Sequence, residues 1–108
     1  MTENEILKTA LVELKERLTA NYPVARLILF GSVVRGETDE ESDVDVLVLT
    51  ARPLSGKEHD AVSDEVFAVN LRYGTNISAL IVDLPSWEEG PLSVMPLRQE
   101  VDREGVEL

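Results

Sequence analysis

The sequence predicts a small α/β (α+β) fold, in which helices pack on one face of a mixed sheet of about three strands. Two long segments carry apolar residues at helical spacing, and three short segments are nearly continuous apolar runs, as buried strands are. Their order along the chain is helix, strand, strand, helix, strand, which favours a layered arrangement. Three strands are close to the fewest that form a stable sheet. The chain is therefore interpreted as a single domain spanning residues 1–108.

Two long helices are predicted at residues 3–20 and 55–74. In the first, leucines recur every three or four residues and form one apolar face: Leu7, Leu11, Leu14 and Leu18. In the second, the same spacing is kept by Val62, Val66, Val69 and Tyr73. Thr2 is placed to cap the first helix, while Ser55 and Gly74 mark the beginning and the end of the second. Each helix should bury one apolar stripe.

Three apolar runs are predicted to form strands, at residues 27–30, 44–49 and 76–82. Because strand side chains alternate between faces, the valines of the second run share one face and should pack against a helix. After the third strand, a short helix or turn is expected at residues 85–87 and an amphipathic segment at residues 92–103. Apolar side chains of this last part should cover the core, and any exposed portion would form a partner-binding patch.

A turn suited to phosphate directly follows the first strand. Gly31 and Ser32 come where the strand ends and a short helical turn begins. A glycine lets a backbone or a phosphate approach closely, and the first amides of a helical turn, with the Ser32 hydroxyl, are suitable donors to phosphate oxygens. Arg35 would add a positive charge there, or it would pair with Glu37 or Asp39 on the surface.

Two carboxylates at the start of the second strand predict a metal site. Asp43 and Asp45 are two residues apart, so they share a face with Cβ atoms about 6–7 Å apart. That separation suits one ion, or two ions about 4 Å apart. The like charges repel one another without a cation, and oxygen ligands favour Mg²⁺ or Mn²⁺ over zinc. Ser42 would brace the preceding loop or contact a nucleotide.

Composition limits the classes of function. The net charge is −11 and the pI near 4.4, which argues against tracking along nucleic acid, and an aromatic content of 5% leaves little for base stacking. The absence of cysteine excludes disulfides and thiolate metal sites, and no run is long enough for a membrane span. His59, the single histidine, lies among charged residues and is interpreted as a surface residue. A cytoplasmic protein is the simplest expectation, because the acidic start does not resemble a signal peptide.

The two motifs together resemble the signature of the DNA polymerase beta superfamily, specifically its minimal nucleotidyltransferase (MNT) group. The motifs are Gly-Ser-Val-Val-Arg-Gly at residues 31–36 and Ser-Asp-Val-Asp-Val-Leu-Val at residues 42–48, separated by five residues. Either motif alone is weak, but both at this spacing, each beside an apolar strand, form a fairly specific signal. The resemblance implies a nucleotidyltransferase fold over nearly the whole chain.

The resemblance also implies an activity, namely transfer of a nucleoside monophosphate, AMP from ATP, to a hydroxyl with pyrophosphate leaving. Asp43 and Asp45 would hold Mg²⁺ (or Mn²⁺), while Gly31, Ser32 and Arg35 would contact the β- and γ-phosphates. MNT domains of this size resemble the antitoxins of HEPN-domain ribonuclease toxins. A hydroxyl on a helical HEPN-type partner protein is therefore the expected acceptor.

One position departs from the family pattern. Relatives carry a third acidic ligand on the next strand, and here the aligned position is Ser78. Asp83 lies just past that strand and is a possible substitute. The loss is expected to lower the catalytic rate more than nucleotide binding, so a catalytically weak or inactive module that neutralises a partner by contact is the alternative. A cation-binding or structural domain without a nucleotide is a third hypothesis, but it leaves the Gly31-Ser32 turn unexplained.

Overall fold

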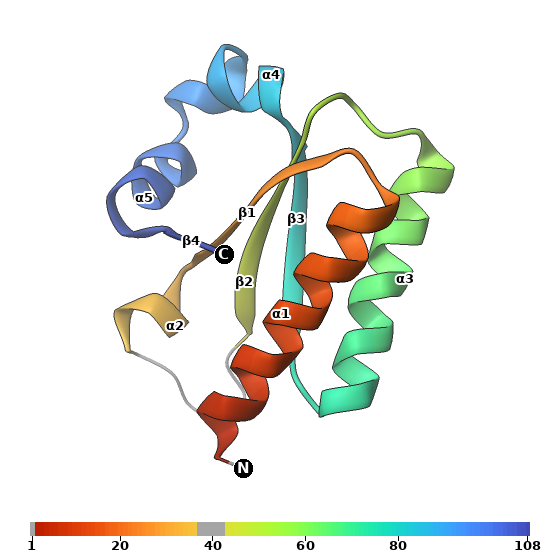
Figure 1. The fold of residues 1–108 in the computed structure, drawn as a ribbon. Coiled ribbons are helices and arrows are strands. Elements are labelled where there is room, and N and C mark those ends of the chain that lie inside the picture. The colour runs from red at the N-terminus through yellow and green to blue at the C-terminus, as the bar shows by residue number, and fades with distance from the viewer. Residues whose placement is uncertain (1, 37–42) are drawn as a thin grey trace.

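The computed structural model describes residues 2–36 and 43–108, and in these parts of the chain four strands form one mixed sheet (Figure 1). The strands are β1 (Val24–Phe30), β2 (Val44–Thr50), β3 (Ile77–Asp83) and β4 (Val106–Glu107), and their spatial order is β3-β2-β1-β4. β2 pairs antiparallel with β1 and parallel with β3, and β4 pairs antiparallel with β1. The parallel pair needs a crossover, which the second long helix supplies.

Two long helices, α1 (Glu3–Asn21) and α3 (Gly56–Tyr73), lie side by side on one face of the sheet (Figure 1). The predicted apolar stripes of both helices form the main core with β1, β2 and β3. This core consists of Ala10, Leu11, Leu14, Leu18, Leu27, Val44, Val46, Val48, Val62, Val66, Val69 and Ile77. The predicted burial of the valine face of β2 against a helix is therefore confirmed.

The ends of the long helices are set by the capping residues that the sequence indicates. Thr2 Oγ1 accepts a hydrogen bond from the amide of Glu5 at 3.2 Å and so caps α1. At the start of α3, Ser55 and Glu58 form a reciprocal capping box, with bonds of 3.2 Å and 3.0 Å. Gly74 has a φ of 66°, the left-handed conformation in which glycine ends a helix.

The opposite face of the sheet is also partly covered, by the part of the chain that follows β3. After β3 the chain forms α4 (Leu84–Glu88), a 3₁₀ turn η1 (Pro91–Val94) and α5 (Pro96–Glu104). α4 and α5 pack there on a second core made of Ile28, Phe30, Leu47, Leu49, Trp87 and Val101. The physical reason is that β1 and β2 are apolar on both faces, so both faces must be buried.

The short strand β4 was not predicted from the sequence. Gly105 ends α5 by donating its amide to the Val101 carbonyl at 2.8 Å, and the chain then pairs with β1 through two residues. A Cβ on Gly105 would lie 2.5 Å from that carbonyl and 2.7 Å from Cγ2 of Ile28. Two residues with exposed side chains carry no strand periodicity, so only the pairing defines this strand.

Most remaining boundaries agree with the predictions, but the segment predicted at residues 92–103 is divided into η1 and α5. β1 begins at Val24, three residues before the predicted apolar run, because its first residues already pair with the end of β2. No helix in the described ranges is both long and apolar enough to cross a membrane.

Candidate active site

Gly31 joins β1 to α2 (Ser32–Arg35) and lies directly beneath a carboxylate. Phe30, the last residue of β1, pairs with Asp45 across the antiparallel ladder. A Cβ placed on Gly31 would lie only 2.5 Å from Oδ2 of Asp45. The φ of Gly31 is 85°, which residues with a side chain rarely adopt. Glycine is therefore required here both by backbone conformation and by the close approach of the Asp45 side chain.

Asp43 and Asp45 lie at the start of β2, on the face opposite the long helices. Val44 and Val46 point into the main core, so the alternation of the strand directs both carboxylates to the other face. Oδ1 of Asp43 accepts a hydrogen bond from Nδ2 of Asn76 at 2.6 Å. Asn76 was not predicted as a site residue, although the parallel pairing of Val44 with Ile77 places it beside Asp43.

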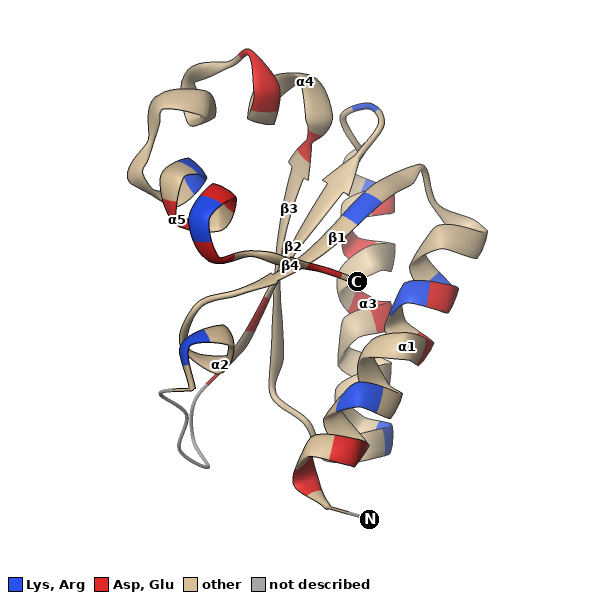
Figure 2. Cartoon of the chain, turned by 60° about the vertical axis from the view of Figure 1, so that its left-hand side comes forward, with Lys and Arg blue, Asp and Glu red and all other residues tan. Residues whose placement is uncertain are grey.

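The electrostatic environment of Asp45 disfavours its charged form. Partial burial raises the pKa of the Asp45 carboxyl, the negative charges of Asp43 and Glu100 raise it further, and Arg35 lowers it. The carboxylates therefore carry an unfavourable interaction that a cation would relieve. Figure 2 shows the positive segment of α2 beside the acidic start of β2.

Arg35 ends the single turn of α2 and forms ion pairs with α5. Its Nη1 lies 2.8 Å from Oε1 of Glu100 and 3.2 Å from Oε2 of Glu104. Sequence reasoning missed both glutamates, because they are 65 and 69 residues away and no local pattern indicates the contact. The alternative partners Glu37 and Asp39, and the candidate Ser42, lie outside the described residues.

Ser78, the residue aligned with the third acidic ligand, lies on β3 beside β2. It pairs with Asp45 in the register of the parallel β2 and β3 strands, and its side chain is exposed. Asp83, the less favoured substitute, pairs with Thr50 at the other end of the β2–β3 ladder and does not lie beside Asp45. It lies five residues further along β3, about 16 Å away, and caps α4 through Ser86 with bonds of 3.0 Å and 2.9 Å. These bonds lower the pKa of the Asp83 carboxyl.

Two carboxylates thus constitute the candidate metal-binding set. Across residues 2–36 and 43–108, no group of three His, Cys, Asp or Glu side chains is close enough to hold an ion. This set fits magnesium, because Mg²⁺ is commonly held by one or two carboxylates, with water and substrate phosphates completing the octahedron. It does not fit a closed zinc site, which needs three or four protein ligands.

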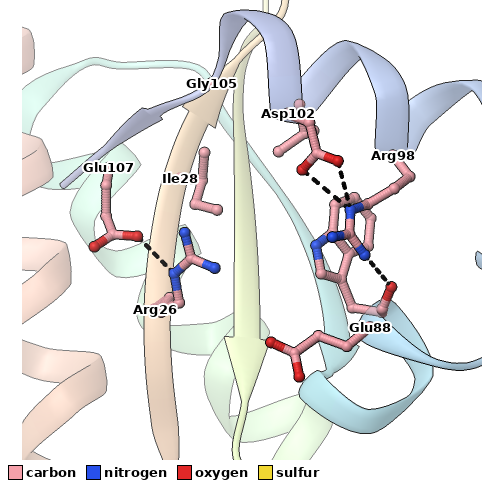
Figure 3. Close-up of a pocket in the computed structure, with 9 residues that line it drawn as sticks. Arg26, Ile28, Glu88, Arg98, Asp102, Gly105 and Glu107 are labelled. Carbon is pink, nitrogen blue, oxygen red and sulfur yellow. Dashed lines mark hydrogen bonds and ion pairs between the residues drawn. The ribbon is translucent and has the colours of Figure 1, made fainter. Parts of the chain in front are cut away.

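A separate pocket of about 170 Å³ lies between β1, β4, α4 and α5 (Figure 3). Two ion pairs line it: Arg26 with Glu107 at 2.6 Å, and Arg98 with Asp102 at 2.9 Å. Arg98 also donates to the Trp87 carbonyl at 2.6 Å, and its guanidinium lies 5.3 Å from the centre of the indole ring. None of the predicted site residues lines this pocket, so we assign it a structural role in holding α5 to the sheet.

His59 is exposed, as predicted, and lies away from the two carboxylates. It borders a second cavity of about 300 Å³ near the end of β2, together with Thr50 and Asp83. The two carboxylates are at the opposite end of β2, so this cavity is distinct from the candidate active site.

Comparison with known proteins identifies the family. The family model for the nucleotidyltransferase domain matches residues 11–89. Two relatives from Methanocaldococcus jannaschii carry the names "Putative protein adenylyltransferase MJ0141" and "Putative protein adenylyltransferase MJ0604". The first is 45% identical, and the match covers 52% of this chain and 57% of the relative. The second is 32% identical, and the match covers 75% of this chain and 74% of the relative. The chain thus spans between about half and three quarters of these relatives.

Solved structures share the fold. A structure described as a "putative minimal nucleotidyltransferase" is 26% identical, with a TM-score of 0.64, and the match covers 100% of this chain and 97% of that one. A complex of the tri-AMPylated Shewanella oneidensis HEPN toxin with an MNT antitoxin matches with a TM-score of 0.51 and 20% identity, over 91% of this chain and 70% of that one. At 20% identity this second match is evidence for the fold alone. With the family model covering most of the chain, this protein belongs to the nucleotidyltransferase domain family and is a minimal nucleotidyltransferase (MNT) domain.

Proposed function

We propose that this MNT domain transfers AMP from ATP to a hydroxyl group of a partner protein, in a reaction that requires Mg²⁺ or Mn²⁺. The observation that carries the proposal is the pair Asp43 and Asp45 on one face of β2, with Asp45 in close contact with Gly31 at the start of α2. The names of the Methanocaldococcus jannaschii relatives support adenylyl transfer to protein.

The residues of the site have separate roles in this proposal. Asp43 and Asp45 hold the divalent ion, whose charge offsets that of the triphosphate and the charge developing at the α-phosphorus. Gly31 and Ser32, with the first amides of α2, contact the β- and γ-phosphates, and Arg35 adds a positive charge beside them. Ser42 remains a candidate contact on the loop before β2.

The proposed reaction is a single displacement at phosphorus. The acceptor oxygen forms a bond to the α-phosphorus while the bond from that phosphorus to the bridging oxygen of the β-phosphate breaks. Pyrophosphate leaves with the electron pair, and the proton of the acceptor hydroxyl is released to water. Because Ser78 rather than a carboxylate faces Asp45 across the ladder, we expect the step that prepares the acceptor to be slow.

We propose a helical protein of the HEPN type as the partner. The structural neighbour from Shewanella oneidensis is an MNT antitoxin in complex with a tri-AMPylated HEPN toxin, and its fold is shared over 91% of this chain. A protein acceptor also agrees with the net charge of −11, which would repel a polynucleotide acceptor.

The first test is calorimetric titration of the purified protein with ATP, with and without Mg²⁺. The same titration on the double variant Asp43→Ala, Asp45→Ala is the comparison, and Asp102→Asn is a control that removes an exposed carboxylate elsewhere. Saturable binding that needs Mg²⁺ and is lost in the double variant supports the nucleotide site. Mass spectrometry of co-purified partners, searching for an added AMP, then identifies the acceptor.

A second candidate function is neutralisation of a partner by contact, and Ser78 at the third-ligand position favours it. The variant Asp43→Asn separates the two functions, because it removes a metal ligand with little change in shape. Loss of both partner modification and partner inhibition supports the enzyme. Inhibition that persists without modification supports the contact module.

A further inference from the structure

We propose that Glu100 and Glu104 of α5 are positioning residues, which hold the Arg35 guanidinium at the edge of the Asp43–Asp45 site. This inference rests on the proposed nucleotide-binding function, since Arg35 acts there on the triphosphate. The two glutamates are not expected to touch the nucleotide; they act through Arg35.

The contacts of Arg35 carry the inference. Glu100 and Glu104 are four residues apart, so they lie on the same side of α5, and both contact Nη1 of Arg35, at 2.8 Å and 3.2 Å. A guanidinium has five N–H donors in a planar fork, so one guanidinium can contact carboxylates and a phosphate together. The hydrogen bond from Arg35 lowers the pKa of the Glu104 carboxyl.

The location of Arg35 connects this ion-pair network to the metal-binding carboxylates. Arg35 ends the single turn of α2, and Gly31 at the start of that turn lies against Oδ2 of Asp45. The glutamates of α5 therefore hold a side chain of the element that adjoins Asp45.

The helix that carries the glutamates is itself firmly attached to the sheet. Val101 is 4% exposed and belongs to the second core, while Arg98 binds the Trp87 carbonyl at 2.6 Å. Figure 3 shows the interactions of Arg98 on this flank of α5, which attach the helix to the rest of the fold. Groups that orient a functional side chain are effective when they are held on a rigid element.

Holding Arg35 matters because a long side chain loses much rotamer entropy when it binds a phosphate. A guanidinium that is already oriented loses less. Removing the glutamates has a competing electrostatic effect, since fewer negative charges near a triphosphate should strengthen binding. Removing a glutamate therefore weakens MgATP binding if loss of Arg35 orientation dominates, and strengthens it if the loss of negative charge dominates. The direction of the change in MgATP affinity distinguishes the two effects.

The experiment is a double-mutant cycle on MgATP affinity, measured by calorimetry on the full chain. The variants are Glu104→Gln, Arg35→Gln and the two combined, and the same cycle is then run with Glu100→Gln. Asp102→Asn is the matched control, because it removes one carboxylate from α5 that pairs with Arg98 on the other flank. Thermal unfolding of each variant checks that the fold is retained.

We expect Glu104→Gln to weaken MgATP binding about two- to fivefold, the range for a partly exposed ion pair. In the Arg35→Gln background the same change should have no effect or should strengthen binding, and Asp102→Asn should leave the affinity unchanged. Equal or tighter binding by Glu104→Gln in the wild-type background would overturn the positioning role. A wild-type protein that shows no saturable MgATP binding would instead overturn the proposed function.

Discussion

Oδ2 of Asp45 lies over the backbone of Gly31, so close that a Cβ on the glycine would be 2.5 Å from it. This relationship joins the two sequence motifs at one point, because Gly31 begins α2 and Asp45 belongs to the start of β2. The turn that is proposed to contact phosphates and the carboxylate that is proposed to hold the metal are therefore in direct contact.

The variant Gly31→Ala is expected to lose both stability and MgATP binding. A non-glycine residue at a φ of 85° costs about 1–3 kcal/mol, and Asp45 must also move away from the new methyl group. Urea unfolding measures the first effect and calorimetry the second.

Gly36→Ala provides the matched comparison for this prediction. Gly36 also has a positive φ, of 72°, but a Cβ placed on it would have no described atom within 4 Å beyond its own chain neighbours. The Gly36→Ala variant should lose about 1–2 kcal/mol of its free energy of unfolding through backbone strain and keep its affinity for MgATP. Equal losses of affinity in both variants would contradict a specific Gly31–Asp45 relationship.

The variant Ser78→Asp is expected to strengthen Mg²⁺ binding, because it places a third carboxylate opposite Asp45 in the β2–β3 register. Without metal, the added charge should lower the unfolding temperature. With Mg²⁺ at ten times its dissociation constant, binding returns about 1.4 kcal/mol of stability. Differential scanning calorimetry with and without Mg²⁺ measures the change, and Ser78→Asn, which adds similar volume without charge, should show neither effect.

The Glu58 carboxyl is expected to contribute to the pH dependence of stability. Its hydrogen bond with Arg52, followed by that with the Ser55 amide, lowers its pKa from 4.5 to about 2. A carboxyl with a lowered folded-state pKa stabilises the protein above its unfolded pKa, and this contribution is lost as the pH falls toward 2. Glu58→Gln should therefore unfold at a lower temperature than the wild type at pH 7, with a difference that shrinks between pH 4.5 and 2.

Thermal unfolding followed by circular dichroism across this range tests the Glu58 prediction. Glu16→Gln, which removes an exposed carboxylate from α1, is the control. A difference in unfolding temperature between Glu58→Gln and wild type that stays constant from pH 7 to pH 2 would contradict a lowered pKa of Glu58 in the folded state.

The variant Arg98→Gln should loosen the attachment of α5. It removes the hydrogen bond to the Trp87 carbonyl and the contact of the guanidinium with the indole ring, together worth about 1–2 kcal/mol. Because Trp87 is the single tryptophan of the sequence, its fluorescence during urea unfolding reports directly on this region. Lys57→Gln is the control, because it changes a charge at the exposed start of α3, and it should leave the midpoint of urea unfolding unchanged.

The sequence by itself determined the parts of the structure that depend on local patterns. The repeats in α1 and α3, the caps at Thr2, Ser55 and Gly74, and the alternation of valines around Asp45 all involve neighbours within one element. These features have a period or a short motif, so they could be recognised before the strands were paired.

The tertiary structure alone decided which distant side chains meet. The contacts of Arg35 with Glu100 and Glu104, the bond between Asp43 and Asn76, and the pairing of β4 join residues from different elements, and charged side chains on exposed surfaces carry no signal of their partners. The distance between Asp83 and Asp45 also depends on the register of β2 and β3, which is set by the tertiary structure. The physical reason is that burial of the two apolar faces of the sheet fixes the position of each helix. Polar side chains on different elements come together only as a result of that packing.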